Sequence, residues 1–338
     1  MTRMHGRVTL GALAILGAIW FTSSPAATQS AGARNSPSPS TGAGPRTPWG
    51  DPDLQGTWTS EAELSVPFER SQELGERQTL TDAEFAQRQA QTQKQLDSDN
   101  SDFDLETADR SNAGQVGSAT SPPPHWLERR KTSRRSSIVI DPPNGRIPAL
   151  TPEGQQRGRG ARGTFLNATF SGPEDVGLWE RCITRGLPGA IFPTVYNANT
   201  RIVQGPGLVA VTYEMIHDTR IIPTDGRTHV SDNVRHYFGD SRGHWEGDTL
   251  VVDVTNFNAK SNYRGSRDTL HLIERFTRVG DGLRYEVTVD DPKTWTGRWT
   301  AALNLEAQPE GLFEYACHEG NYAMRNILSG ARAADSVR

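Results

Sequence analysis

Residues that can move a proton occur on the apolar faces of predicted β-strands. Alternate side chains of a strand face opposite sides of its sheet, so the apolar residues identify the interior side. Glu274 falls among the apolar residues of segment 270–278, and His217 ends the apolar face of segment 208–217. Glu319 follows in the same phase if the last strand continues. A histidine and a carboxylate in one apolar interior predict general acid–base chemistry.

The same reasoning defines two sets of candidate site residues. The expected catalytic set contains the interior acid and base groups and their chain neighbours, namely His217, Glu274, Glu319, Asp218 and His318. The expected substrate-binding set contains aromatic rings, an amide and two guanidinium groups, namely Tyr213, Asn256, Tyr285, Trp299, Arg185 and Arg220. A buried carboxylate without a partner is costly, so Glu274 requires either a partner or a raised pKa.

Two alternatives compete with this catalytic interior. The polar residues could form a structural network inside the barrel, or they could sit at an edge that is open to water. A one-residue slip in strand phase would bring a different set inside, consisting of Glu214, His271, Glu286 and Glu314. A polar interior is expected in either phase, although its members differ.

The histidines do not form a familiar metal motif. Six of the eight histidines lie between residues 217 and 318, but no pair has the spacing of a common zinc site. Residues 239–243 lack the lysine and the following helix of a phosphate loop. We therefore expect no organic cofactor and no metal, with a divalent metal held by loop His, Asp and Glu residues as the alternative.

The elements that position these residues are predominantly β-strands. The sequence contains 33 Gly and 21 Pro, and turn signals such as Gly-Asp-Gly at 280–282 separate short alternating segments. This pattern predicts a mainly β protein whose antiparallel meander closes into a lipocalin-like barrel, or alternatively forms a β-sandwich. Thr81 and Glu84 form a capping-box pattern before a short surface helix to about Leu96.

The N-terminus has the pattern of an export signal. Arg3 and Arg7 precede an apolar segment, and small residues follow it. We assign residues 1–33 to a signal peptide, 34–48 to a disordered linker and 49–332 to a single β-rich domain. The apolar segment is too short to cross a bilayer, so a membrane anchor is the less favoured alternative. A secreted or periplasmic location follows, with no membrane span after signal removal.

Cys182 and Cys317 are the two cysteines of the chain. An oxidising compartment predicts a disulfide between them. The alternatives are a catalytic thiolate assisted by the neighbouring His318, or two inert buried thiols.

Four longer segments resemble a family of secreted bacterial proteins that is numerous in acidobacterial genomes. They are Glu180–Pro188, Glu214–Pro223, Gly239–Leu250 and Tyr315–Tyr322. The resemblance covers residues 49–332 and implies export and a common fold, but it implies no reaction. Gly56-Thr57-Trp58 also resembles the start of lipocalin-type barrels.

Composition narrows the classes of function. The net charge of −4 argues against a nucleic-acid binder, and the mean hydropathy of −0.62 argues against an integral membrane protein. Although the net charge is slightly negative, five basic residues cluster within one short segment, namely Arg129, Arg130, Lys131, Arg134 and Arg135. It predicts either a solvated approach to a strand or a site for a polyanion or an anionic glycan.

Two principal functions remain. The first is an exported, cofactor-independent lyase, isomerase or hydrolase that acts on a small molecule or a sugar. The second is a non-catalytic periplasmic or cell-surface protein that binds a small ligand or a glycan through its aromatic interior. A structural role in the envelope is a third hypothesis. The sequence specifies neither the substrate nor the oligomeric state.

Overall fold

The structure of the protein, a computed structural model, describes residues 44–99, 131–159 and 170–336. The predicted signal peptide, most of the predicted linker, and Arg129 and Arg130 lie outside the described residues. Arg46 forms an isolated β-bridge with Pro52, so paired structure begins just before Trp49. The domain boundaries expected at residues 49 and 332 stay predictions.

The described chain contains ten strands and three α-helices. The strands are β1 (Gly56–Thr59), β2 (Val139–Asp141), β3 (Asn199–Gly205), β4 (Leu208–Tyr213), β5 (Thr219–Pro223), β6 (Asp240–Glu246), β7 (Thr249–Thr255), β8 (His271–Val279), β9 (Gly282–Asp290) and β10 (Trp299–Ala307). The α-helices are α1 (Asp82–Asp99), α3 (Pro152–Arg159) and α4 (Ala323–Asp335). Short 3-10 helices are η1 (Glu61–Ser65), η2 (Gln72–Leu74), η4 (Pro173–Asp175) and η5 (Met215–His217).

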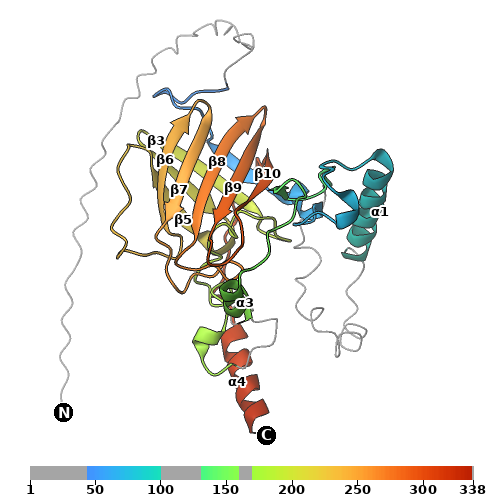
Figure 1. The fold of residues 1–338 in the computed structure, drawn as a ribbon, viewed down its shortest axis with the longest axis vertical. Helices are drawn as coiled ribbons and strands as arrows, with labels where there is room; N and C mark the ends of the chain where they lie inside the picture. Colours follow the sequence, from blue (N-terminus) through green and yellow to red (C-terminus); the bar gives the residue numbers. More distant parts are fainter. Residues whose placement is uncertain (1–43, 100–130, 160–169, 337–338) are drawn as a thin grey trace, which may run out of the picture. The chain divides into compact units, whose positions relative to one another are not determined.

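The strands form one antiparallel sheet that nearly closes into a barrel (Figure 1). The hydrogen-bonded order is β5-β4-β3-β1-β10-β9-β8-β7-β6, and β2 pairs with β10 outside this path. The two end strands, β5 and β6, lie against each other without a hydrogen-bonded ladder between them. The prediction of a mainly β antiparallel barrel is therefore confirmed.

Alternation in β8 and β9 sets the interior face of the barrel. Leu272, Glu274 and Phe276 are buried on β8, and the flanking residues of the strand are more exposed. Tyr285 and Val287 occupy the same face of β9, because Phe276 pairs with Tyr285 and Glu274 pairs with Val287. The predicted phase of these two strands is confirmed, and the alternative phase is wrong for them.

A glycine allows the two end strands to approach closely. A Cβ atom added to Gly243 of β6 would lie 2.9 Å from methyl groups of both Ile222 and Thr224. These distances are shorter than van der Waals contact, so a larger residue at this position would separate the strands. The barrel is closed here by packing, in the absence of a hydrogen-bond ladder.

Two predicted strands differ from the structure. The strand expected over 208–217 ends at Tyr213, because Ile216 and His217 adopt positive φ angles of 70° and 57° in the following turn. The strand expected over 312–317 does not form. Conversely, β6 was not predicted, because its sequence Asp-Ser-Arg-Gly-His reads as a loop.

The surface helix α1 begins as its capping signal predicts. The Thr81 Oγ1 atom accepts a hydrogen bond from the Glu84 backbone N–H, and the Glu84 carboxylate accepts one from the Thr81 backbone N–H. The helix lies outside the barrel (Figure 1). Within the described part of the chain, no helix is both long enough and apolar enough to span a membrane.

Candidate functional site

The barrel interior contains a bidentate ion pair between Arg220 of β5 and Glu274 of β8. The Arg220 Nη1 and Nη2 atoms donate to the two Glu274 carboxylate oxygens at 2.6 and 2.8 Å. Tyr285 Oη donates to the same carboxylate at 2.8 Å. Arg220 is 5% exposed and Glu274 is fully buried. The pair connects the end strand β5, which has a hydrogen-bonded ladder on one side only, to β8 through the barrel interior.

This network opposes a role for Glu274 as a general base. Both carboxylate oxygens already accept hydrogen bonds, and protonation of Glu274 would leave the guanidinium of Arg220 buried without a counter-ion. Burial alone would lower the pKa of Arg220, but the charge of Glu274 raises it above its ordinary value. Burial raises the pKa of Tyr285 well above its ordinary value. The guanidinium of Arg220 and the hydroxyl of Tyr285 therefore both stay protonated at neutral pH.

Trp299 and Tyr213, two other predicted interior residues, are also buried, and the Tyr213 ring centroid lies 6.0 Å from the Arg220 guanidinium. Trp299 is fully buried between Tyr263 and Trp295, and its Nε1 atom has no hydrogen-bond partner among the described residues. Tyr213 is also buried, and its ring packs against Phe238. None of these contacts brings in His217.

Asn256 holds a loop in place. Its Nδ2 atom donates to the carbonyl oxygens of Val230 and Ser231 at 3.0 and 3.3 Å. It has a positive φ of 57° at the end of β7, so the alternation of the strand ends there. Asn256 therefore fixes the loop between β5 and β6.

His217 and Glu319 were expected in the interior, and this expectation is wrong. Both are exposed, as is His318. The physical reason is the early end of β4 and the missing strand over 312–317, because the period of two applies only within a strand. Hence the predicted pairing of His217 with Glu274 or Glu319 does not occur in the structure.

The predicted disulfide between Cys182 and Cys317 is present, with an S–S distance of 2.01 Å. It joins the segments Glu180–Pro188 and Tyr315–Tyr322, and the segment starting at Glu214 reaches the same place through His217 and Asp218. Three of the four segments singled out in the sequence thus converge. We call the residues gathered there the disulfide cluster: Trp179, Thr184, Arg185, Tyr196, His217, Asp218 and Tyr315.

Arg185 is the charged centre of the disulfide cluster. Its guanidinium lies over the Trp179 ring, 5.2 Å from the ring centroid. Its Nη1 atom is buried and has no hydrogen-bond partner among the described residues. Burial lowers the pKa of Arg185, and the nearby groups that oppose this effect are the hydroxyls of Tyr196 and Tyr315. A buried guanidinium without a carboxylate is an attractive position for an anion.

Aromatic rings surround this guanidinium. Tyr196 and Tyr315 stack with an interplanar angle of 7° and centroids 6.4 Å apart. Trp179 Nε1 donates to Tyr315 Oη at 3.4 Å. Burial raises the pKa of Tyr196 to about 12, so its hydroxyl stays protonated at neutral pH. All three residues are partly exposed.

His217 and Asp218 complete the disulfide cluster. The backbone N–H of Tyr315 donates to His217 Nε2 at 3.1 Å, which places the ring proton on Nδ1. Thr184 Oγ1 donates to the Asp218 carboxylate at 2.7 Å, and burial raises the pKa of Asp218. Sequence reasoning missed Trp179, Tyr196 and Thr184, although Trp179 and Thr184 lie in or beside a segment that was singled out.

A second buried carboxylate positions the Tyr315 segment. Glu214, expected inside only in the alternative phase, is 1% exposed. Its carboxylate accepts hydrogen bonds from Asn199 Nδ2 at 2.8 Å and from the Phe313 backbone N–H at 2.8 Å. Several backbone and amide donors satisfy this charge in place of a cation. Glu214 thereby holds the chain that leads to Tyr315 against the barrel.

A chain of four acid and base groups crosses the outside of the barrel, and sequence reasoning did not predict it. His229 Nδ1 lies 2.7 Å from Asp240, and His229 Nε2 lies 2.8 Å from Asp253. The other Asp253 oxygen lies 2.7 Å from His271 Nε2. Both ring nitrogens of His229 are occupied, so this chain fastens the β5–β6 loop to β7 and β8.

No group of three or more His, Cys, Asp or Glu residues within the described ranges is arranged to hold a metal ion. The hydrogen bonds of His229 and His271 go to carboxylates. The disulfide occupies both cysteines.

Comparisons with known proteins give limited information. No family model matches the chain, and no curated protein matches it. A solved structure, a secretary abundant heat soluble (SAHS) protein from Ramazzottius varieornatus, is similar to part of it. The identity is 10%, the TM-score is 0.23, and the match covers 32% of this chain and 70% of that one. The class that the fold defines is a nearly closed antiparallel β-barrel with a disulfide-linked cluster of side chains.

Proposed function

We propose that the protein is exported and binds a small anionic ligand that carries a planar or aromatic group, at the disulfide cluster. The observation that carries the proposal is the Arg185 guanidinium, whose buried Nη1 atom has no partner among the described residues. A carboxylate oxygen is the usual partner of such a group. The disulfide supports an oxidising, secreted or periplasmic location.

The ring of the ligand is inferred from the surroundings of Arg185. Trp179, Tyr196 and Tyr315 present aromatic faces beside the guanidinium. Aromatic pairs contribute about 0.5–1.5 kcal/mol beyond their buried area, so a planar ligand would gain from both the rings and the cation. An exposed His217 with a proton on Nδ1 adds a further donor.

The proposal is tested by titration calorimetry of the full mature chain with benzoate. Benzyl alcohol, which lacks the charge, and acetate, which lacks the ring, are the comparison ligands. We expect benzoate to bind most tightly, and we expect Arg185→Gln to weaken it at least about tenfold, the equivalent of one charged hydrogen bond.

Arg181→Gln is the matched control, because Arg181 lies four residues from Arg185 in the chain and its guanidinium pairs with Glu174. This variant should bind benzoate as the natural chain does. Equal loss in both arginine variants, or no binding of benzoate, would contradict the proposal.

An acid–base enzyme is the second candidate, favoured by one observation. His217 and Asp218 lie in the same disulfide cluster as Arg185. Proton transfer at His217 Nε2 would require loss of its hydrogen bond from Tyr315, and such rearrangements accompany substrate binding in some enzymes. Recovery of the bound ligand chemically unchanged supports the binding protein. A product that disappears in His217→Asn supports the enzyme.

A further inference from the structure

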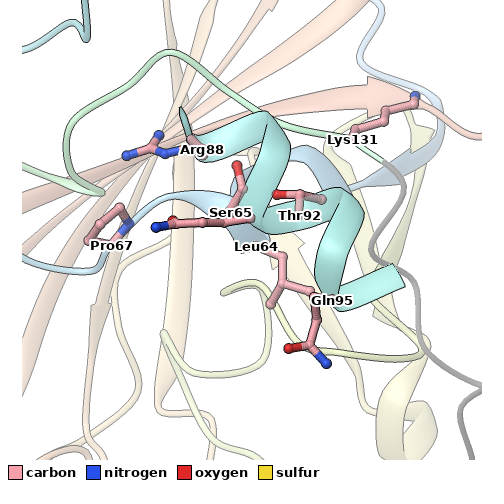
Figure 2. Close-up of a pocket in the computed structure, with 8 residues that line it drawn as sticks. Leu64, Ser65, Pro67, Arg88, Thr92, Gln95 and Lys131 are labelled. Carbon is pink, nitrogen blue, oxygen red and sulfur yellow. The ribbon is translucent and has the colours of Figure 1, made fainter. Parts of the chain in front are cut away.

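A cavity of about 320 Å³ lies between helix α1 and the end of η1, and none of its lining residues belongs to the disulfide cluster (Figure 2). Its volume is at the lower end of the range for small-ligand sites. Arg88, Gln91, Thr92 and Gln95 line it from α1, with the spacing of one helix face. Figure 2 shows Arg88 and Lys131 at opposite ends of the cavity, with Thr92 and Ser65 between them.

Arg88 differs from the cations around it. Arg134 pairs with Asp82 at 2.6 Å, Arg135 pairs with Glu63 at 2.7 Å, and Lys131 pairs with Glu306. Arg88 Nη1 instead donates to two uncharged carbonyl oxygens, those of Ser133 and Arg135, both at 2.7 Å. Within the described ranges its guanidinium forms no ion pair. Burial lowers the pKa of Arg88, and the nearby Glu63 carboxylate, which pairs with Arg135, only partly opposes this effect. A negative charge that enters the cavity therefore meets a partly desolvated cation.

The remaining lining suits a ligand with many hydroxyl groups. The carboxamides of Gln91 and Gln95 and the hydroxyl of Thr92 belong to groups that can both donate and accept hydrogen bonds. The Ser65 hydroxyl already donates to the Ala62 carbonyl oxygen and accepts from the Ser133 backbone N–H. Leu64 and Pro67 add an apolar patch that suits C–H groups. None of the described residues that line the cavity is acidic or aromatic.

We propose that this cavity binds an acidic sugar, with the sugar carboxylate at Arg88 and its hydroxyl groups on the glutamine side chains of α1. The chemistry differs from that of the disulfide cluster, where aromatic rings surround the cation. The basic cluster in the sequence already indicated an anionic glycan as one partner. Among the described residues, Lys131, Arg134 and Arg135 of that cluster form ion pairs, whereas Arg88, which lies outside the cluster in sequence, forms none.

The probe is trigalacturonic acid, titrated calorimetrically into the full mature chain, with its methyl-esterified form as the uncharged analogue and acetate as the charged analogue without hydroxyl groups. We expect trigalacturonic acid to bind and both analogues to bind at least about tenfold more weakly. Equal binding of the methyl ester would overturn the role of Arg88. Equal binding of acetate would overturn the sugar assignment.

Two variants locate the site, and one matched variant is the control. Arg88→Gln should remove the preference for the acid over its ester, and Gln91→Ala should weaken both forms several-fold. Gln93 lies on the same helix, bonds to Asp97 and does not line the cavity, so Gln93→Ala should bind as the natural chain does.

Arg88 donates hydrogen bonds to two carbonyl groups, so melting curves must show that Arg88→Gln is folded. If it is not folded, the result for Gln91→Ala decides whether the cavity is the sugar-binding site. Arg185→Gln should leave binding of trigalacturonic acid unchanged, which separates this proposal from that for the disulfide cluster. Binding that is equal in Gln91→Ala and Gln93→Ala, or lost in Arg185→Gln, would overturn the proposal.

Discussion

Two arginines of this protein lie in contrasting surroundings. Arg220, in the barrel interior, meets Glu274 through two hydrogen bonds of 2.6 and 2.8 Å. Arg185, at the disulfide cluster, lies over Trp179 and leaves Nη1 without a partner among the described residues. The first charge is compensated by the fold itself, and the second is not.

The two arginines have different roles, because Arg220 stabilises the barrel and Arg185 is the proposed ligand-binding group. Both oxygens of Glu274 bond to Arg220, so the ion pair leaves no guanidinium or carboxylate group free for a ligand. The pair also fixes β5 to β8. An uncompensated arginine contributes little to stability, because a buried charge without a partner is costly. Its retention at Arg185 is explained if a ligand supplies the missing charge.

The largest expected effect concerns the disulfide that assembles the Arg185 region. Replacement of both Cys182 and Cys317 by serine removes a crosslink with a sequence separation of 135 residues. The chain-entropy relation gives a loss of about 5 kcal/mol. Denaturant unfolding should show this loss, and benzoate binding should fall with it. An unchanged unfolding midpoint would contradict the structural role of the crosslink.

The next effect concerns the compensated arginine. Glu274→Gln leaves Arg220 buried without a counter-ion and should lower the free energy of unfolding by about 3–5 kcal/mol, measured by urea denaturation. The double variant Arg220→Met, Glu274→Leu removes both charges and should restore most of the loss. A double variant that is less stable than Glu274→Gln would contradict the explanation that the loss comes from an uncompensated charge on Arg220.

A smaller effect concerns pH at the carboxylate–histidine chain. The hydrogen bond between Asp253 and His271 lowers the pKa of Asp253 and raises that of His271. The Asp253 contribution is present above about pH 4 and is lost as pH falls through its lowered pKa; the His271 contribution is present below about pH 6.5 and is lost as pH rises through its raised pKa. His229 faces the same carboxylate and Asp290 of β9 lies near His271.

His271→Asn should therefore reduce stability most between about pH 4 and 6.5, and least above the raised pKa of His271. Both partners are more than a third exposed, so we expect less than about 1 kcal/mol. Melting temperatures of the two proteins across this pH range provide the measurement. A difference that grows as pH rises above 6.5 would have the wrong sign.

The smallest effect on stability is expected at the uncompensated arginine. Arg185→Gln removes a cation–π contact and also a buried charge without a partner, so the two changes oppose each other and the net change should stay within about 1 kcal/mol. Urea denaturation in the absence of ligand is the measurement. Arg220→Gln is the comparison, because it leaves Glu274 buried and unpaired. Similar losses in the two variants would contradict the contrast between the arginines.

Part of the site could be predicted from the sequence. Alternation identified Glu274, Tyr213, Tyr285 and Trp299 as interior residues, and all four are buried. The sequence also predicted that Glu274 requires either a partner or a raised pKa, and the structure provides Arg220 as the partner. That Arg220 and Glu274 form a pair was not predicted, because residues of β5 and β8 meet only after the barrel closes.

The sequence by itself determined most of the strands, the inward faces of β8 and β9 and the two cysteines able to pair, because side-chain alternation and turn residues act over a few neighbouring residues. The tertiary structure alone decided the position of His217 outside the barrel, since two positive φ angles after Tyr213 end the alternation. It also decided which arginine is neutralised. Charge compensation depends on distances between segments that are far apart in the chain. In the folded barrel Arg220 pairs with Glu274, whereas Arg185 packs against an aromatic ring.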